Sequence, residues 1–181
     1  VEVSKDRKEA IKKVGIIFQN PDHQIIFPTV GEELRFGLTQ LGLRTNEADL
    51  KVIACLKKYN KIDWLERSIS TLSQGQKHLV CLLSVLLMEP SVLLLDEPTN
   101  DLDVETLQAL ESAIQTFPGS IMIISHDRWF LDKLCTHILS FEGESNVNFF
   151  SGNYSEYEED RLKRLGKREV LPERVKYKKL N

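Results

Sequence analysis

A short apolar run that ends in two adjacent carboxylates most constrains what this chain can fold into. Val92 to Leu95 are aliphatic, and Asp96 and Glu97 follow them directly. Such a run predicts a buried β-strand, and open α/β sheets bind ligands at the carboxyl ends of their strands. Two carboxylates at that place suit Mg²⁺ binding and the positioning of a water molecule. Taken alone, the pair fits a solvated acidic turn equally well.

The pattern on both sides of this strand predicts the fold class. A first buried strand is expected at Val14–Phe18, and three or four helical segments follow between Val30 and Met88. After Pro90 the pattern predicts strands at 92–95, 121–125, 138–141 and 147–150, and helices at 104–117, 128–135 and 154–165. Such alternation predicts an α/β fold with a mainly parallel sheet and an inserted helical subdomain.

The same pattern divides the chain into four segments. We expect residues 1–28 to form part of the core, residues 29–90 to form the helical subdomain, residues 91–150 to complete the core, and residues 151–181 to form a charged helix with a basic tail.

Composition and cysteine usage favour a cytoplasmic protein. A formal charge of −3 does not favour a protein that covers nucleic acid with its whole surface. The apolar run Val80–Met88 is far shorter than the roughly 20 residues of a membrane-spanning helix, so any association with the inner face of a membrane has to go through a partner. The cysteines Cys55, Cys81 and Cys135 are far apart in apolar stretches, which predicts buried, reduced thiols.

The segment LSQGQ, residues 72–76, is a second candidate binding element. It precedes the apolar helix predicted at Gln74–Met88, so Ser73 would lie at the N-cap of that helix. Free backbone N–H groups and the positive end of the helix dipole bind anions there. Simple helix capping explains Ser73 but gives no reason for Gly75 or Gln76.

Two further polar residues follow predicted strands. Gln19 comes after the first strand, and His126, within Ser125-His126-Asp127, comes after the strand at 121–125. Both would lie near Glu97, because the carboxyl ends of parallel strands meet at one edge of the sheet. A histidine there could hydrogen-bond to a γ-phosphate or to the attacking water, and Gln19 could reach Mg²⁺. A single histidine at a strand end is more often a surface or capping group.

The order of these elements resembles the ABC ATPase superfamily. A strand followed by Gln19, a helical insert, LSQGQ, LLLDEP, LD at 102–103 and a strand followed by SHD occur in that order between Val14 and Asp127. In that family they are the Q-loop, signature, Walker B, D-loop and switch-histidine motifs. The resemblance implies a P-loop NTPase-like fold, ATP and Mg²⁺ as ligands, and a second nucleotide-binding domain as partner in a head-to-tail dimer.

The resemblance also implies a role for each candidate residue. Asp96 would bind Mg²⁺, Gln19 would contact the metal and couple the site to a partner, Glu97 would be the catalytic base and His126 the switch. The nucleotide of the partner domain would be contacted by Ser73, Gln74, Gly75 and Gln76, and Asp103 would make the D-loop contact across the dimer. Gln74 departs from the family, which usually has glycine at this position, although the backbone could still serve there.

The phosphate-binding loop of the family does not occur in the sequence. None of the nine glycines begins a G-x-x-x-x-G-K-[S/T] stretch, whose backbone amides and lysine hold the β and γ phosphates. In the family this loop precedes the Q-loop. We therefore expect that this chain lacks the N-terminal part of the core, that residues before Val1 supply it, and that the polypeptide alone has little or no ATPase activity.

The two halves of the chain resemble different branches of the family. The first half, with VGIIFQNPDHQIIFPTVGEELRFGLTQLGL, is similar to the ATPase motors of energy-coupling-factor importers for vitamins or cobalt, which act on a membrane transporter subunit. The second half, with SHDRWFLDKLCTHILSFEG and FFSGNYSEYEEDRLKRLG, is similar to ABC-F proteins of the translational-throttle type, which bind the ribosome. We interpret the chain as an ABC-F type domain acting in translation. The alternatives are an importer ATPase and a non-functional chimeric fragment joined within Pro90–Asn100.

The C-terminal tail is rich in basic residues. They are Arg161, Lys163, Arg164, Lys167, Arg168, Arg174, Lys176, Lys178 and Lys179, with Tyr177 among them. Such a segment could contact the phosphates of ribosomal RNA. A solvated helix with a disordered end explains the same composition.

Overall fold

A computed structural model describes residues 12–100, 102–143 and 146–165 of the chain. The chain forms two compact units, with the boundary between Arg128 and Trp129. This boundary falls inside the segment 91–150, which we had expected to complete the core.

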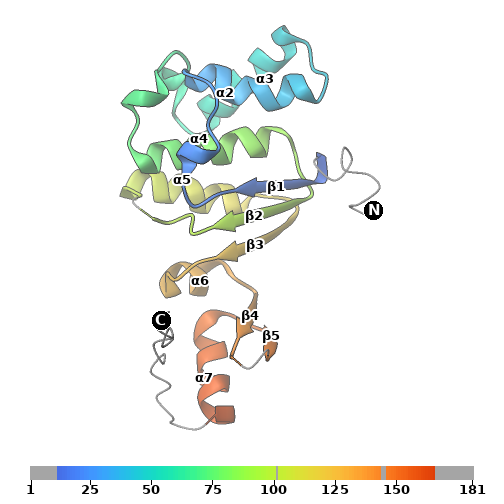
Figure 1. Ribbon diagram of the computed structural model, residues 1–181, viewed down its shortest axis with the longest axis vertical. Coiled ribbons are helices and arrows are strands. Elements are labelled where there is room, and N and C mark those ends of the chain that lie inside the picture. The colour runs from blue at the N-terminus through green and yellow to red at the C-terminus, as the bar shows by residue number, and fades with distance from the viewer. Residues whose placement is uncertain (1–11, 101, 144–145, 166–181) are drawn as a thin grey trace, which may run out of the picture. The chain divides into compact units, whose positions relative to one another are not determined.

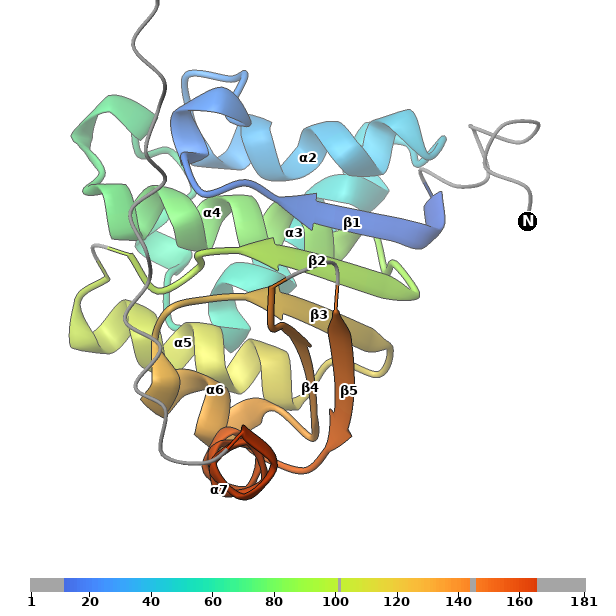
Figure 2. The same ribbon diagram turned by 60° about the horizontal axis from the view of Figure 1, so that its bottom comes forward.

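The first unit is built on a three-stranded parallel sheet in the order β1-β2-β3. The strands are β1 (Val14–Ile17), β2 (Val92–Asp96) and β3 (Ser120–Ile124). In the register, Leu95 of β2 lies beside both Ile17 of β1 and Ile123 of β3. All three strands therefore end at the same edge of the sheet, as the parallel arrowheads in Figure 2 show.

Helices cover one face of this sheet. The helices α4 (Gln74–Leu87) and α5 (Val104–Gln115) lie along it, and α2 (Val30–Gln40) and α3 (Thr45–Lys58) lie beyond α4 (Figure 1). Three short 3₁₀ helices connect these elements: η1 (Pro21–His23), η2 (Ile62–Trp64) and η3 (Ile69–Thr71). Residues 29–90, for which we expect a helical subdomain, contain α2, α3, η2, η3 and α4, and they belong to the same compact unit as the sheet.

The alternation of side chains along the strands separates a covered face from an open one. Ile17, Leu93 and Leu95 are buried beneath α4 and α5, whereas Ile16 and Met122 are 44% and 53% exposed on the other face. Helix α4 approaches β1 so closely that a Cβ atom on Gly15 would lie 2.2 Å from Cγ1 of Val85. Only glycine allows this approach.

The second unit contains an antiparallel hairpin and a helix. Its elements are most of α6 (Arg128–Leu134), β4 (His137–Phe141), β5 (Val147–Ser151) and α7 (Tyr154–Leu165). The alternating pattern would place the strand expected at 138–141 in the parallel sheet, but β4 pairs antiparallel with β5. The reason is the short connection between Phe141 and Val147, because a parallel pair needs a crossover of a dozen or more residues.

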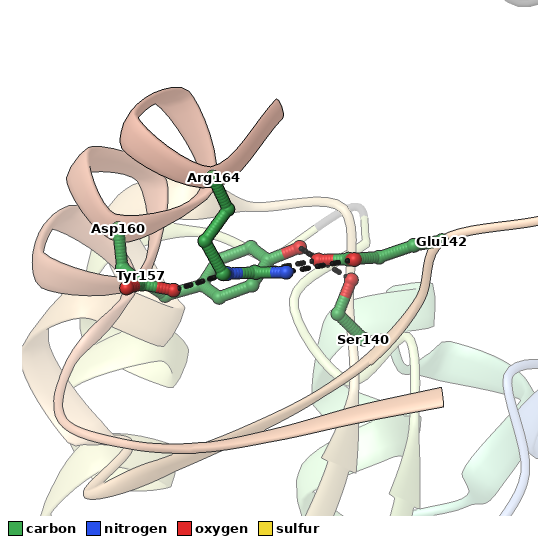
Figure 3. Close-up of polar contacts among 5 residues, drawn as sticks. All are labelled: Ser140, Glu142, Tyr157, Asp160 and Arg164. Carbon is green, nitrogen blue, oxygen red and sulfur yellow. Dashed lines mark hydrogen bonds and ion pairs between the residues drawn. The ribbon is translucent and has the colours of Figure 1, made fainter. Parts of the chain in front are cut away.

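A buried carboxylate fixes α7 to this hairpin (Figure 3). The guanidinium of Arg164 donates to both oxygens of Glu142, with N···O distances of 2.9 and 3.2 Å, and the hydroxyl of Tyr157 donates to the same carboxylate at 3.0 Å. The Glu142 side chain is only 4% exposed. These hydrogen bonds, led by those from Arg164, lower the pKa of Glu142 below its ordinary value of 4.5. Arg164 is thereby engaged within the second unit, and it also pairs with Asp160.

This network predicts an acid-sensitive second unit. A carboxyl whose folded pKa is lowered stabilises the protein fully above its unfolded pKa, and the contribution is lost as the pH falls through the folded value. Amide hydrogen-exchange protection of β4, β5 and α7 should therefore decrease as the pH falls below about 4.5. Glu142→Gln should lower this protection at neutral pH and remove most of its dependence on acid. The exposed carboxylate of Glu159 is a matched control, and an equal effect of Glu159→Gln would contradict the assignment.

The structure bears on two expectations from composition, that the thiols are buried and reduced and that no segment crosses a membrane. The three cysteines are free; Cys81 is buried, whereas Cys55 and Cys135 are only partly buried. Burial raises the pKa of Cys81 to about 12 and that of Cys55 to about 11, so both thiols stay protonated at neutral pH. Within the described residues, no helix has the length and apolar character needed to cross a membrane.

Candidate active site

Candidate residues follow the carboxyl ends of all three parallel strands. Gln19 comes two residues after Ile17 at the end of β1, Asp96 is the last residue of β2, and His126 comes two residues after Ile124 at the end of β3. Gln19 is exposed, Asp96 is half-buried and Glu97 is buried. The strand register thus brings these four candidate residues to one edge of the sheet, as the sequence predicted.

Glu97 has an unusual backbone conformation. Its φ angle is +44°, in the left-handed region that non-glycine residues seldom adopt. Its N–H donates to the carbonyl oxygen of Ile124 at 2.8 Å, so the turn that follows β2 stays attached to β3. Strained residues of this kind cluster at functional sites. The sequence gives no signal for this conformation.

Glu97 and His126 contact each other at this edge. The backbone N–H of His126 donates to Oε2 of Glu97 at 3.3 Å, and Nε2 of its ring lies 3.5 Å from Oε1. The His126 side chain is 99% exposed and that of Glu97 is 11% exposed. Oε1 of Glu97 has no hydrogen-bond partner among the described residues. A buried carboxylate oxygen without a donor is costly, so this atom is ready to accept a hydrogen bond from a bound water.

The signature segment forms the N-terminus of α4. Ser73 is the N-cap, and its Oγ accepts from the N–H of Gln76 at 3.2 Å, while Oε1 of Gln76 accepts from the N–H of Ser73 at 3.2 Å. This capping box engages both side chains. The N–H groups of Gln74 and Gly75 have no intrahelical acceptor because they belong to the first helical turn. They are the groups of this segment that an anion could bind.

The side chain of Gln74 faces the segment after β1. Its Nε2 donates to Oδ2 of Asp22 at 2.9 Å, and Nζ of Lys77 donates to Oδ1 of the same carboxylate at 2.7 Å. The sequence analysis missed Asp22 and Lys77. No sequence pattern links a residue of the Q-loop segment to a helix more than fifty positions later.

Asp103 serves a local purpose in this structure. It is the N-cap of α5, and its carboxylate accepts a hydrogen bond from the N–H of Thr106 at 2.7 Å, which is the largest cause of its lowered pKa.

Lys61 is buried beside the same helix. It donates to Oε1 of Glu105 in the first turn of α5 at 2.5 Å, and its Nζ lies 5.0 Å from the ring centroid of Trp64. The sequence analysis missed Lys61 as well. Residue 101 lies outside the described residues.

The two candidate metal ligands fit Mg²⁺ chemically. Asp96 and Gln19 offer carboxylate and amide oxygens, and Mg²⁺ prefers oxygen ligands. Among the described residues there is no cluster of three or more His, Cys, Asp or Glu side chains that could hold a metal ion by itself. Where a protein supplies one or two ligands, Mg²⁺ takes its other ligands from water and phosphate.

Only part of the basic tail can be placed. Lys163 is exposed and Arg161 is half-buried, both on α7. Lys167, Arg168, Arg174, Lys176, Tyr177, Lys178 and Lys179 lie outside the described residues. Arg164, bound to Glu142, is not available for a phosphate without breaking that pair.

Known proteins resemble this chain over most of its length. The profile of the ABC transporter family matches residues 2–100, more than half of the chain. The energy-dependent translational throttle protein EttA of Escherichia coli strain K12 is 43% identical over 168 residues, which are 93% of this chain and 30% of that protein. The biotin transport ATP-binding protein BioM of Rhodobacter capsulatus is 46% identical over 127 residues, which are 70% of this chain and 54% of that protein. The chain thus spans less than two thirds of either relative.

Solved structures agree with this assignment. The cbiO1 protein of Clostridium perfringens, part of the ABC transporter complex cbiONQ, matches with a TM-score of 0.69 and 29% identity over 85% of this chain and 63% of that one. An ATP-binding subunit of an ABC transporter matches with a TM-score of 0.72 over 92% of this chain and 68% of that one, but at 18% identity it bears on the fold alone. The predicted α/β fold with a parallel sheet is confirmed. The family profile and these likenesses show that the chain belongs to the ABC transporter family of ATPases.

Proposed function

We propose that this chain is the signature-bearing part of an ATP-hydrolysing ABC domain that acts at the ribosome in the cytoplasm. The observation that carries the hydrolytic part is the contact between Glu97 and His126 at the carboxyl edge of the sheet, 3.5 Å from Oε1 to Nε2. A buried carboxylate oxygen without a hydrogen-bond donor beside an exposed imidazole suits the activation of a water molecule.

The residues at the edge of the sheet divide the work of hydrolysis between them. Asp96 and Gln19 would hold Mg²⁺, which would neutralise the negative charge of the phosphates. Glu97 orients the attacking water and accepts its proton. His126 is fully exposed and is held through its backbone by Glu97, so its ring can turn toward a γ-phosphate and donate a hydrogen bond.

In this proposal the signature segment contacts a second nucleotide, which is bound by the partner domain. The N–H groups of Gln74 and Gly75 would bind the γ-phosphate held by another nucleotide-binding domain, and Ser73 would fix the end of the helix that presents them. Asp103 would stand at the contact between the two domains. The sequence contains no phosphate-binding loop, so a polypeptide of these residues alone should hydrolyse little ATP.

The ribosomal branch is supported by the extent of the throttle alignment. The EttA match covers 93% of the chain, so it has to continue through α6 and into the second unit. That match and the one to BioM, which covers 70% of the chain, both have to cross Leu95. Both branches therefore align on either side of the supposed junction within Pro90–Asn100, as members of one family do.

The second candidate function is that of an importer motor. BioM is a biotin transport ATP-binding protein and is 46% identical to this chain, and cbiO1 is part of an ABC transporter complex. In this case the partner would be a membrane subunit that the chain binds at the inner face of the membrane.

Fractionation of cells that express the tagged gene product with Glu97→Gln separates the two functions. Loss of the catalytic carboxylate should hold the protein in its ATP-bound state, so it should sediment with ribosomes when ATP is present and leave them as salt is raised, because phosphate contacts weaken with salt. The exposed carboxylate variant Glu66→Gln is the control. Recovery in the membrane fraction together with a membrane subunit would instead support the importer function.

A further inference from the structure

The glutamine at position 74 has an explanation in the structure. The side-chain amide of Gln74 donates to Oδ2 of Asp22 at 2.9 Å. Lys77, one turn further along α4, donates to the other oxygen at 2.7 Å. A single carboxylate thus holds two side chains on the same face of the signature helix.

Asp22 is itself held firmly after the Q-loop. It lies in η1, and its N–H donates to Oδ1 of Asn20 at 2.9 Å. The buried Pro21 beside it presents its carbonyl oxygen to the thiol of Cys81, one turn beyond Lys77 on α4, with an S···O distance of 3.9 Å. The 3₁₀ helix η1 (Pro21–His23), which begins two residues after Gln19, is therefore attached to α4 at two successive turns.

The charges at this contact favour a positioning role over a stabilising one. Hydrogen bonds from Gln74 and Lys77 lower the pKa of Asp22, so it is ionised at neutral pH. The Lys77 side chain is 16% exposed and that of Asp22 is 44% exposed. Because the Asp22 carboxylate is open to solvent, screening limits the contribution of this pair to the free energy of unfolding, but hydrogen bonds to both of its oxygens fix the geometry of the two segments.

We propose that Asp22 is a positioning residue that makes the Q-loop segment and the N-terminus of α4 move as one body, and that Gln74 supplies this connection in this chain. The inference rests on the proposed function, because it assigns Gln19 and the N–H groups of Gln74 and Gly75 to nucleotide sites. A displacement of the Q-loop segment would then move the signature amides directly. A glycine at position 74 would leave only Lys77 for this contact.

Swapping the amide of Gln74 and the carboxylate of Asp22 tests the proposal in the full-length gene product. Gln74→Glu places a carboxylate against Asp22 and should raise amide hydrogen exchange of residues 20–24 and 73–77 about tenfold or more, the effect of losing a hydrogen bond to a charged group. Adding Asp22→Asn should restore protection, since the new amide can donate to the new carboxylate, which also lies within reach of Lys77. The unfolding midpoint should change little in any of these variants.

The control and the kinetic measurement separate this proposal from the proposed function. Gln108→Glu, an exposed glutamine on α5, should leave the exchange of both segments unchanged. In steady-state assays, Gln74→Glu should lower kcat for ATP severalfold and the double variant should recover it. Independent, additive exchange effects of the two substitutions would overturn the connection. If the double variant regains its protection against exchange but the full-length protein shows no ATPase activity, the connection through Asp22 stands and the proposed function is rejected.

Discussion

Replacement of Glu97 by glutamine should lower kcat for ATP hydrolysis by a factor of about 100 or more, the usual contribution of a positioned general base. The amide can still accept the hydrogen bond from the N–H of His126, now 3.3 Å from Oε2, but it cannot take a proton from water. ATP should still bind, so nucleotide should remain on the purified protein. The measurement is steady-state phosphate release together with the amount of bound nucleotide, in a gene product that includes a phosphate-binding loop.

Two controls define this result. Glu66→Gln changes an exposed carboxylate of the helical subdomain and should leave kcat within a factor of about two, as surface substitutions do. A polypeptide of the 181 residues alone should show no difference between the two variants, because little hydrolysis is expected in either. An unchanged kcat in Glu97→Gln would show that Glu97 is not the general base.

The largest stability effect is expected in the strand that carries the two carboxylates. Leu93 is 0% exposed and lies beside Gly15 in the register of β1 and β2. Leu93→Ala removes buried methyl groups and leaves a cavity, so it should lower the free energy of unfolding by about 2–5 kcal/mol. Urea unfolding followed by tryptophan fluorescence in a Trp129→Phe background, where Trp64 alone reports on its own unit and is 3% exposed, would measure this change.

Leu50 provides the matched control for this substitution. It is 69% exposed on α3, so Leu50→Ala should change the free energy of unfolding by no more than about 0.5 kcal/mol. Similar losses in both variants would mean that β2 is not packed as described, and the placement of Asp96 and Glu97 would then be in doubt.

Periodicity predicted the elements that carry the site. The apolar run before Asp96 and the one before Ser125 became neighbouring strands, and LSQGQ became the N-terminus of a helix, because burial of apolar side chains dominates these segments. The strand at 138–141 was predicted, but its pairing partner was not, since periodicity does not specify which strands pair.

Polar contacts between distant segments were beyond sequence reasoning. Lys61 lies in a charged stretch that a pattern would leave exposed, yet it is buried, and its ammonium lies over the ring of Trp64 and donates to Glu105. Asp22 and Gln74 are equally polar, and only the folded chain brings them within 2.9 Å. Hydrogen bonds of this kind depend on three-dimensional placement and leave no periodic trace.

The left-handed backbone of Glu97, with φ of +44°, has an evolutionary consequence. Glycine adopts this conformation freely, whereas any residue with a Cβ gives up roughly 1 kcal/mol of stability there. A lineage released from the need to hydrolyse ATP would gain by exchanging the glutamate codon for a glycine codon, which a single nucleotide change achieves. The residue found at this position in descendants of the gene would therefore record whether their site still works.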